Sequence, residues 1–142
     1  MRRNWVVDAS VVVKLYLPEE LSDVTEALFE APGTKSFFVP DIFYCECANI
    51  FWKNVRRLKI QPVNAQSNLR GLMDLIIFPV SSTELLYDTL DLALEYGITA
   101  YDASYVALSE KLRIPLLTAD RKLITNLQGT GADIHWLGDL PS

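Results

Sequence analysis

The stretch Trp5-Val6-Val7-Asp8-Ala9-Ser10 decides the fold class, because it sets an acidic residue directly after a short apolar segment. Trp5 to Val7 form a brief apolar, partly β-branched run, which is typical of a buried strand. The residues after Ser10 stay largely apolar through Leu17, where Pro18 interrupts them. Asp8 therefore marks the passage from a buried strand to a first helix.

The same alternation continues along the chain. Apolar periodicity and breaking residues predict further strands over residues 37–39, 75–80, 114–118 and 134–136, and helices over 19–31, 41–58, 63–74, 82–97, 99–113 and 120–127. Short apolar strands separated by helices predict an α/β fold with a mainly parallel sheet covered on both faces. In such sheets the ligand site lies outside the carboxyl ends of the strands.

Helical spacing also predicts which side chains face the core. In the helix over 63–74 we expect Leu69, Leu72 and Met73 on one buried side. In the helix over 82–97, capped by Ser82 or Thr83, we expect Leu86, Leu90, Ala93 and Leu94 to point inward.

Length and composition limit the function classes. The 142 residues predict a single domain over 1–142, with 50% apolar and 22% charged residues as in ordinary globular proteins. The net charge of −5 argues against wrapping nucleic acid through bulk charge. Apolar runs such as Leu75-Ile76-Ile77-Phe78 are too short for a membrane span, and Asp8 cuts the first apolar run too early for a signal peptide. We expect a cytosolic protein without a membrane partner.

The cysteines and the single histidine give little support to zinc or nucleophilic chemistry. Cys45 and Cys47 point to nearly opposite faces of a helix, so we expect buried free thiols rather than a metal or disulfide pair. His135 would have to carry a Ser-His-Asp triad alone.

Four carboxylates have both a structural and a functional interpretation. Asp8 and Asp120 follow predicted strands at the edge where a ligand site belongs, but each could instead cap the helix that follows. Glu46 lies among Phe43, Ile42 and Ile50 on its helix, where a carboxylate needs an ion pair or a ligand.

Asp102 has the same two interpretations. Thr99-x-x-Asp102 matches a capping box, in which the acid stabilises a helix start. The small residues Ala100, Ala103, Ser104 and Ala107 would let this helix pack closely on the sheet and direct Asp102 toward the strand ends.

Four segments together carry a family resemblance. They are Val6-Val7-Asp8-Ala9-Ser10, Val39-Pro40-Asp41 leading to Glu46-x-x-Asn49, Tyr101-Asp102-Ala103-Ser104-Tyr105-Val106-Ala107, and Leu117-Thr118-Ala119-Asp120-Arg121-Lys122-Leu123. In order and spacing, over nearly the whole chain, they resemble the PIN domain family and, within it, VapC-type toxin ribonucleases. The resemblance implies a three-layer α/β/α fold with a parallel five-stranded sheet, Mg²⁺- or Mn²⁺-dependent RNA cleavage, a homodimer and an antitoxin partner.

The resemblance also assigns residues. It places an acidic quartet on Asp8, Glu46, Asp102 and Asp120, and supporting polar groups on Ser10, Asn49 and Thr118. We expect Asp8 and Asp120 to bind metal directly, Asp102 directly or through water, and Glu46 to hold a second ion or orient the attacking water. Some members carry a further acid after the last aspartate, where this chain has Arg121 and Lys122, which weakens the case for a second ion.

Basic residues cluster on the helix that carries Glu46. A solvated helix face explains this cluster as well as a row of residues that contacts RNA phosphates does. The second interpretation predicts RNA contacts for Lys53, Arg56, Arg57 and, beside Asp120, Arg121. The same helix holds four aromatic residues that belong either to the core or a dimer interface, or to a groove for an inhibitor: Phe43, Tyr44, Phe51 and Trp52.

Two other functions fit part of the pattern. An aspartate-nucleophile phosphotransferase also has an acid after its first strand, but usually a second acid two residues on, where this chain has Ser10. A catalytically inactive PIN-like binding or scaffold module is the non-enzymatic alternative; such a chain should have lost site acids, and this one keeps all four.

Overall fold

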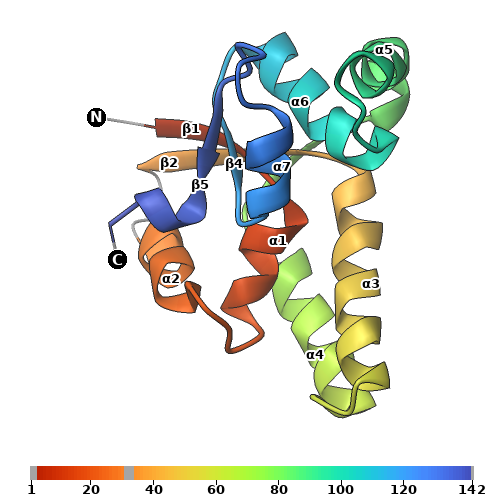
Figure 1. Ribbon diagram of the computed structural model, residues 1–142. Coiled ribbons are helices and arrows are strands. Elements are labelled where there is room, and N and C mark those ends of the chain that lie inside the picture. Colours follow the sequence, from red (N-terminus) through yellow and green to blue (C-terminus); the bar gives the residue numbers. More distant parts are fainter. Residues whose placement is uncertain (1–2, 31–33, 142) are drawn as a thin grey trace.

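The computed structural model describes residues 3–30 and 34–141. Its central sheet has five parallel strands in the order β3-β2-β1-β4-β5 (Figure 1). The strands are β1 (Arg3–Val7), β2 (Lys35–Pro40), β3 (Phe78–Val80), β4 (Leu116–Thr118) and β5 (Ile134–Trp136). The predicted α/β fold with a parallel five-stranded sheet is confirmed, although β3 is shorter than the predicted segment 75–80.

Helices cover both faces of this sheet. They are α1 (Ala9–Val12), α2 (Ser22–Glu30), α3 (Ile42–Arg56), α4 (Pro62–Met73), α5 (Leu86–Tyr96), α6 (Ala100–Leu112) and α7 (Arg121–Asn126), with short 3₁₀ turns η1 (Val13–Leu15), η2 (Ser82–Leu85) and η3 (Leu137–Asp139). In Figure 1, α5 and α6 lie on one side of β1 and β2, and α1 to α4 lie on the other. The predicted end of the second helix at residues 31–33 lies outside the described residues.

Small residues bring α6 against the sheet, as the sequence predicts. Ala103, Ser104 and Ala107 are buried, and α6 packs on β1, β2 and β4. Ala100, at the helix start, is exposed. This close packing sets the first turn of α6 beside the carboxyl ends of the strands, where Asp102 lies.

The predicted inward face of α5 is wrong for its three leucines, whereas Ala93 is partly buried and packs against the core. Leu86, Leu90 and Leu94 are each more than half exposed, whereas Leu85, Thr89 and Leu92 are buried. Two sets of residues with helical spacing lie along this segment. Because α5 packs against α6, the set that contains Thr89 faces the core. The exposed row is apolar and is left without a partner in a single described chain.

Two single-residue predictions of burial are also wrong. Met73 is more than half exposed at the end of α4, although Leu72 beside it is fully buried. Cys45 is exposed, whereas Cys47 is buried as expected, because residues two apart on α3 face opposite ways.

The four aromatic residues of α3 separate into two groups. Phe43 and Phe51 belong to the core, and Tyr44 is half-buried against it. Trp52 is 57% exposed. The core interpretation therefore holds for Phe43 and Phe51 and fails for Trp52.

The strand order defines where a ligand crevice belongs. From β1 the chain builds β2 and β3 on one side of the sheet, and later adds β4 and β5 on the other. Parallel sheets bind ligands outside the carboxyl ends of the strands where the order reverses, which here is between β1 and β4. Asp8 directly follows β1, and Asp120 lies two residues after β4.

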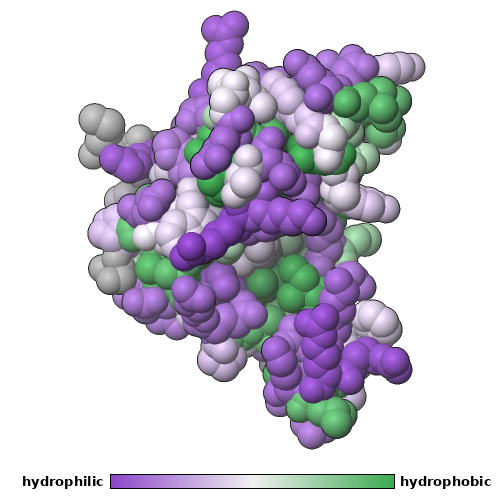
Figure 2. Space-filling view, viewed as in Figure 1, coloured by the Kyte–Doolittle hydropathy of each residue, from purple (hydrophilic) through white to green (hydrophobic). Residues whose placement is uncertain are grey.

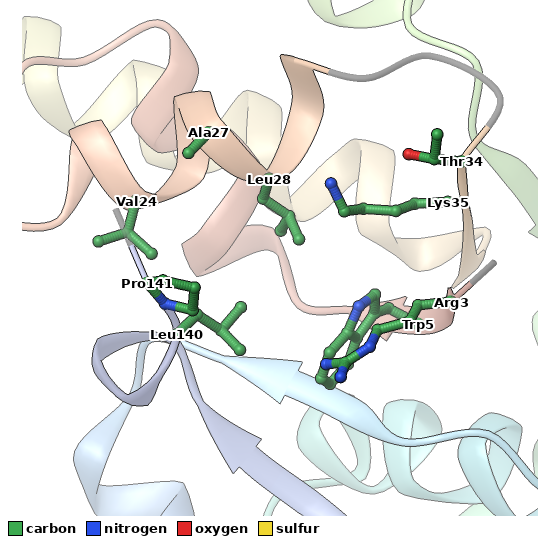
Figure 3. A pocket seen from close by; sticks show the side chains of 9 residues that line it. All are labelled: Arg3, Trp5, Val24, Ala27, Leu28, Thr34, Lys35, Leu140 and Pro141. Atoms are coloured by element: carbon green, nitrogen blue, oxygen red, sulfur yellow. The ribbon is translucent and has the colours of Figure 1, made fainter. Parts of the chain in front are cut away.

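A cavity of about 530 Å³ lies at the other edge of the sheet, away from these acids (Figure 3). Its lining includes Arg3 and Trp5 at the start of β1 and Leu28 of α2. It holds none of the predicted site residues. No helix among residues 3–30 and 34–141 is both long and apolar enough to cross a membrane.

Candidate active site

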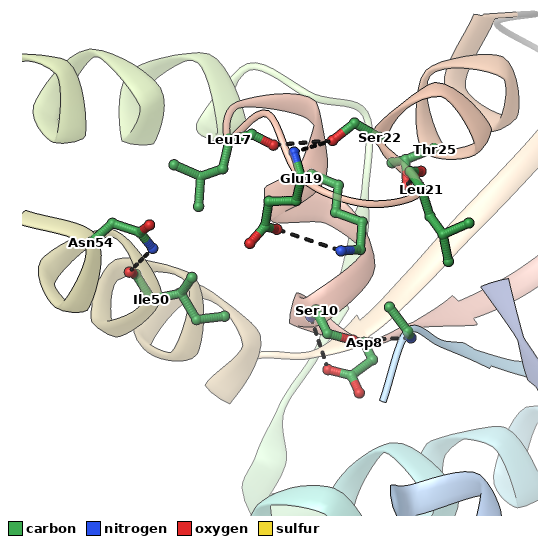
Figure 4. A network of polar contacts seen from close by, with 11 residues as sticks. Asp8, Ser10, Leu17, Glu19, Leu21, Ser22, Thr25, Ile50 and Asn54 are labelled. Carbon is green, nitrogen blue, oxygen red and sulfur yellow. Dashed lines mark hydrogen bonds and ion pairs between the residues drawn. The ribbon is translucent and has the colours of Figure 1, made fainter. Parts of the chain in front are cut away.

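Asp8 is held in place through both of its carboxylate oxygens. Its Oδ1 accepts a hydrogen bond from the Ser10 amide at 3.1 Å, which caps α1 (Figure 4). Its Oδ2 accepts one from the Thr118 hydroxyl at 2.8 Å. The residue is only 8% exposed, and burial raises its pKa, with the charge of Asp120 adding to the rise. The capping and functional interpretations of Asp8 are thus compatible.

The hydroxyls of Thr118 and Ser10 join the two loops of the crevice. Thr118 Oγ1 accepts a hydrogen bond from the Asp120 amide at 3.1 Å, and Ser10 Oγ accepts one from the Ala119 amide at 3.1 Å. These contacts fix the segment after β4 against the segment after β1. The two predicted supporting hydroxyls therefore lie beside Asp8 and hold the site together.

Replacing Thr118 by valine is expected to destabilise the protein. The substitution keeps the shape but leaves a buried oxygen of Asp8 without its donor, which costs about 1–3 kcal/mol. Chemical denaturation of the metal-free protein measures the loss. Thr125→Val, at an exposed hydroxyl of α7, is the matched control; equal stability of the two variants would contradict this role of Thr118.

Asp120 begins α7 and also faces a cavity. Its Oδ1 accepts hydrogen bonds from the amides of Lys122 at 2.9 Å and Leu123 at 3.4 Å. Together with Asp102 and Thr99 it lines a cavity of about 280 Å³. The cap uses Oδ1, so Oδ2 remains available to a ligand.

Asp102 lies in the first turn of α6, and a side-chain hydrogen bond with Thr99 favours the ionised form of its carboxylate. The Thr99 hydroxyl caps the helix by accepting from the Asp102 amide at 3.1 Å. Burial raises the pKa of Asp102 to about 6, and the charges of Asp8 and Asp120 add to the rise, while Lys122 opposes it. The carboxylate of Asp102 is therefore close enough to the acids after β1 and β4 for their charges to act on it.

Glu46 reaches the same environment from α3. Its Oε1 accepts a hydrogen bond of 2.6 Å from the hydroxyl of Tyr105, a fully buried residue of α6. Burial raises the pKa of Glu46 to about 7 despite this bond, and the charges of Asp8 and Asp102 contribute. The salt bridge that the sequence left open for Glu46 is replaced by this tyrosine contact.

The four carboxylates repel one another and have no basic ion-pair partner in the described part of the chain. The salt bridges found there join Lys14 to Glu19, Lys111 to Glu84, and His135 to Asp133. A divalent cation bound among these carboxylates would offset their negative charges.

The donor set fits a hard cation that keeps some of its water. Among residues 3–30 and 34–141, no group of three or more aspartate, glutamate, histidine or cysteine side chains is placed so that it could hold a metal ion. Mg²⁺ usually keeps several water ligands and is held by one or two carboxylates, with oxygen donors only. Carboxylate oxygens are donors that suit Mg²⁺ or Mn²⁺ rather than a closed zinc site, which uses histidine and cysteine ligands.

The remaining predicted residues lie farther out. Asn49 is exposed one turn after Glu46, and the basic residues of α3 are exposed beyond it. Arg121 is exposed at the start of α7, with its guanidinium 4.0 Å from the centre of the Trp136 ring. The supporting role of Asn49 and the RNA contacts of Lys53, Arg56, Arg57 and Arg121 remain predictions.

Sequence reasoning missed two residues of this site. Tyr105 is the hydrogen-bond donor to Glu46, and Lys122 is the cation nearest to Asp102 and lines its cavity. Tyr105 follows Asp102 by three residues on an apolar helix, and a buried tyrosine needs a partner for its hydroxyl, so this signal was present. Lys122 is a basic residue two positions after Asp120, and no sequence pattern indicates that its charge acts on Asp102.

Comparisons with known proteins agree with this geometry. A family model described as the PIN domain matches residues 5–126. The ribonuclease VapC3 of Pyrobaculum aerophilum is 40% identical over 121 residues, which cover 83% of this chain and 90% of that protein.

Solved structures share the fold. A crystal structure of a Pyrobaculum aerophilum protein matches with a TM-score of 0.69 and 24% identity, covering 97% of this chain and 93% of that one. A chain of a toxin–antitoxin complex from Klebsiella pneumoniae matches with a TM-score of 0.60 and 15% identity, covering 94% and 95%. With a family model over most of its length and a close relative by sequence, the chain belongs to the PIN domain family and, within it, to the VapC-type proteins.

Proposed function

We propose that this protein is a VapC-like toxin that hydrolyses phosphodiester bonds of RNA with the help of Mg²⁺ or Mn²⁺. The observation that carries the proposal is the convergence of four carboxylates from separate segments at the point where the strand order reverses: burial raises the pKa of Asp8, Glu46 and Asp102, and charges of neighbouring site acids add to each rise. The name of the 40% identical relative, a ribonuclease, supports RNA as the substrate.

Asp8, Asp102 and Asp120 are the residues that would hold the metal. A bound divalent cation lowers the pKa of water and offsets negative charge that develops on the phosphate. The hydroxyls of Ser10 and Thr118 keep Asp8 and the loop of Asp120 in fixed positions. Preorganised ligands of this kind lower the cost of assembling the site around substrate.

Glu46 is suited to orient the attacking water and to accept its proton. Its carboxylate enters the crevice from a different element than the three aspartates, and Tyr105 holds one of its oxygens in a fixed position. A pKa of about 7 lies near the operating pH, where a general base is most effective. A cation bound nearby would lower this pKa and keep Glu46 ionised at neutral pH.

Replacing Tyr105 by phenylalanine is expected to move the acidic limb of the pH–rate profile to higher pH. The hydroxyl stabilises ionised Glu46, so its loss raises the pKa of Glu46 further and leaves less carboxylate at a given pH. RNA cleavage measured over a pH series with saturating Mn²⁺ tests this. An unshifted limb with a uniformly lower rate would instead assign Tyr105 a purely structural role.

RNA cleavage by the purified protein tests the proposed function. A mixed panel of transfer, ribosomal and messenger RNA is incubated with Mn²⁺ or with EDTA, and the products are mapped. The proposal predicts cleavage only with metal, and equal cleavage by Glu110→Gln, an exposed acid later on α6. Mn²⁺ binding without cleavage of any RNA would favour an inactive binding module instead.

The partner proposals rest on separate observations. The toxin–antitoxin complex among the structural neighbours supports an antitoxin for this chain. The exposed apolar row of Leu86, Leu90 and Leu94 on α5, with Tyr87 beside it, supports a homodimer in which a second copy covers this face.

A further inference from the structure

The charge of the protein is divided sharply between one helical hairpin and the rest. Residues 42–73, which contain α3 and α4, carry five basic side chains and one acidic side chain, a net charge of +4. The whole chain has a net charge of −5, so the remainder carries −9. In Figure 1 the two helices extend away from the sheet as an antiparallel pair, and Figure 2 shows this projection as largely hydrophilic.

The basic residues of α3 form a row that starts at the site. Lys53 and Arg57 follow Glu46 by seven and eleven residues, so they share its helix face. They lie about 10 and 16 Å farther along the axis. Both are exposed, and no salt bridge in the described part of the chain involves them.

An exposed tryptophan lies next to this row. Trp52 is 57% exposed, whereas the tryptophan of β1, Trp5, is 4% exposed. The guanidinium of Arg56 lies 5.7 Å from the centre of the Trp52 ring. Trp52 also lines an apolar groove of about 270 Å³ between α3 and α4, together with Val55 and Leu69.

We propose that Trp52 and Arg56 form a stacking platform for one unpaired base of the RNA strand, while Lys53, level with the platform, and Arg57, beyond it, contact the phosphates of the strand. Aromatic rings and guanidinium planes bind unpaired bases by stacking, and the positive hairpin complements the charge of RNA. The platform lies about 9 Å beyond Glu46 along α3. A base stacked on the platform would therefore keep its nucleotide at a fixed distance from the phosphodiester bond that is cleaved. This inference rests on the proposed ribonuclease function.

Binding of a fluorescein-labelled single-stranded RNA of about 12 nucleotides tests the platform. Fluorescence anisotropy in EDTA measures affinity without cleavage. Trp52→Ala is expected to weaken binding about 5- to 150-fold, the loss typical of one stacked base, and Trp52→Phe to retain most of the affinity. Phe78→Ala, which removes a half-exposed aromatic ring from β3, is the matched control and should bind as the wild type does.

Abasic RNA separates stacking from other roles of Trp52. One abasic position along the strand should weaken binding to the wild type and have no effect on Trp52→Ala. Equal RNA affinity of the wild type and Trp52→Ala, with the wild type still cleaving RNA, would overturn the platform and leave the proposed function intact. Absence of both RNA binding and cleavage in the wild type would overturn the proposed function together with the platform.

Discussion

Asp102→Asn is expected to lower RNA cleavage at least about 100-fold while raising the melting temperature of the metal-free protein. Substituting groups that merely support a metal ligand already costs about 10- to 100-fold in activity or metal affinity, and Asp102 is proposed as a ligand itself. Asparagine removes a charge that burial and the charges of Asp8 and Asp120 disfavour. Lower cleavage together with a higher melting temperature identifies a functional acid, because removing a structural acid would lower the melting temperature.

The geometry makes Asp102→Asn a clean substitution. The helix start is held by the Thr99 hydroxyl and the Asp102 amide, and both remain in the variant. Asp8, in contrast, bonds Ser10 and Thr118, so its replacement would disturb the loops as well. Cleavage rates and thermal melts are compared with those of Glu110→Gln on the same helix. A variant with unchanged cleavage, or with a lower melting temperature in EDTA, would contradict the role assigned to Asp102.

The stability of the metal-free protein is expected to fall as the pH rises from about 4 to about 7. Folding raises the pKa of Asp8, raises that of Asp102 from 3.8 to about 6, and raises that of Glu46 from 4.5 to about 7. The folded state therefore binds more protons than the unfolded state in this interval. Stability is highest below the unfolded pKa values and is lost as the pH passes the folded ones.

Glu46→Gln and Mn²⁺ separate the contributions to this pH dependence. The variant should show a flatter stability curve near the upper end of the interval, because glutamine has no proton to lose there. Mn²⁺ should stabilise the wild type more at about pH 7 than at about pH 5, since it binds the ionised acids. Denaturant melts in EDTA and in Mn²⁺ measure both. A wild-type stability that rises with pH in EDTA would contradict the raised pKa values.

The general architecture could be predicted from the sequence because its signals are local. The run Trp5 to Val7 followed by Asp8, and the breaks at Pro18 and Gly97, specify strands and helices without tertiary information. Parallel pairing and the switch between β1 and β4 then explain why Asp8 and Asp120 lie at one edge. The carboxylates of Glu46 and Asp102 could be chosen as candidates because acids on apolar helices need a partner.

Features that depend on packing could not be predicted in the same way. On α5, two sets of residues with helical spacing could face the core. Only the contact of α5 with α6 shows that Leu85, Thr89 and Leu92 do so. The bond between Tyr105 and Glu46 joins residues 59 positions apart, so no local pattern contains it. The exposure of Trp52, one residue after buried Phe51, likewise follows from the direction in which the α3–α4 hairpin leaves the sheet.

The central claim is that acids from separate segments share one metal site, and Mn²⁺ binding measured by isothermal titration calorimetry tests it most directly. The wild type is compared with Asp8→Asn, Glu46→Gln, Asp102→Asn and Asp120→Asn, with Glu110→Gln as the control. The account predicts one class of site in the wild type, weakened by the aspartate substitutions and, to a smaller extent, by Glu46→Gln, but unchanged in the control. Unchanged Mn²⁺ affinity in Asp102→Asn and Asp120→Asn would contradict it.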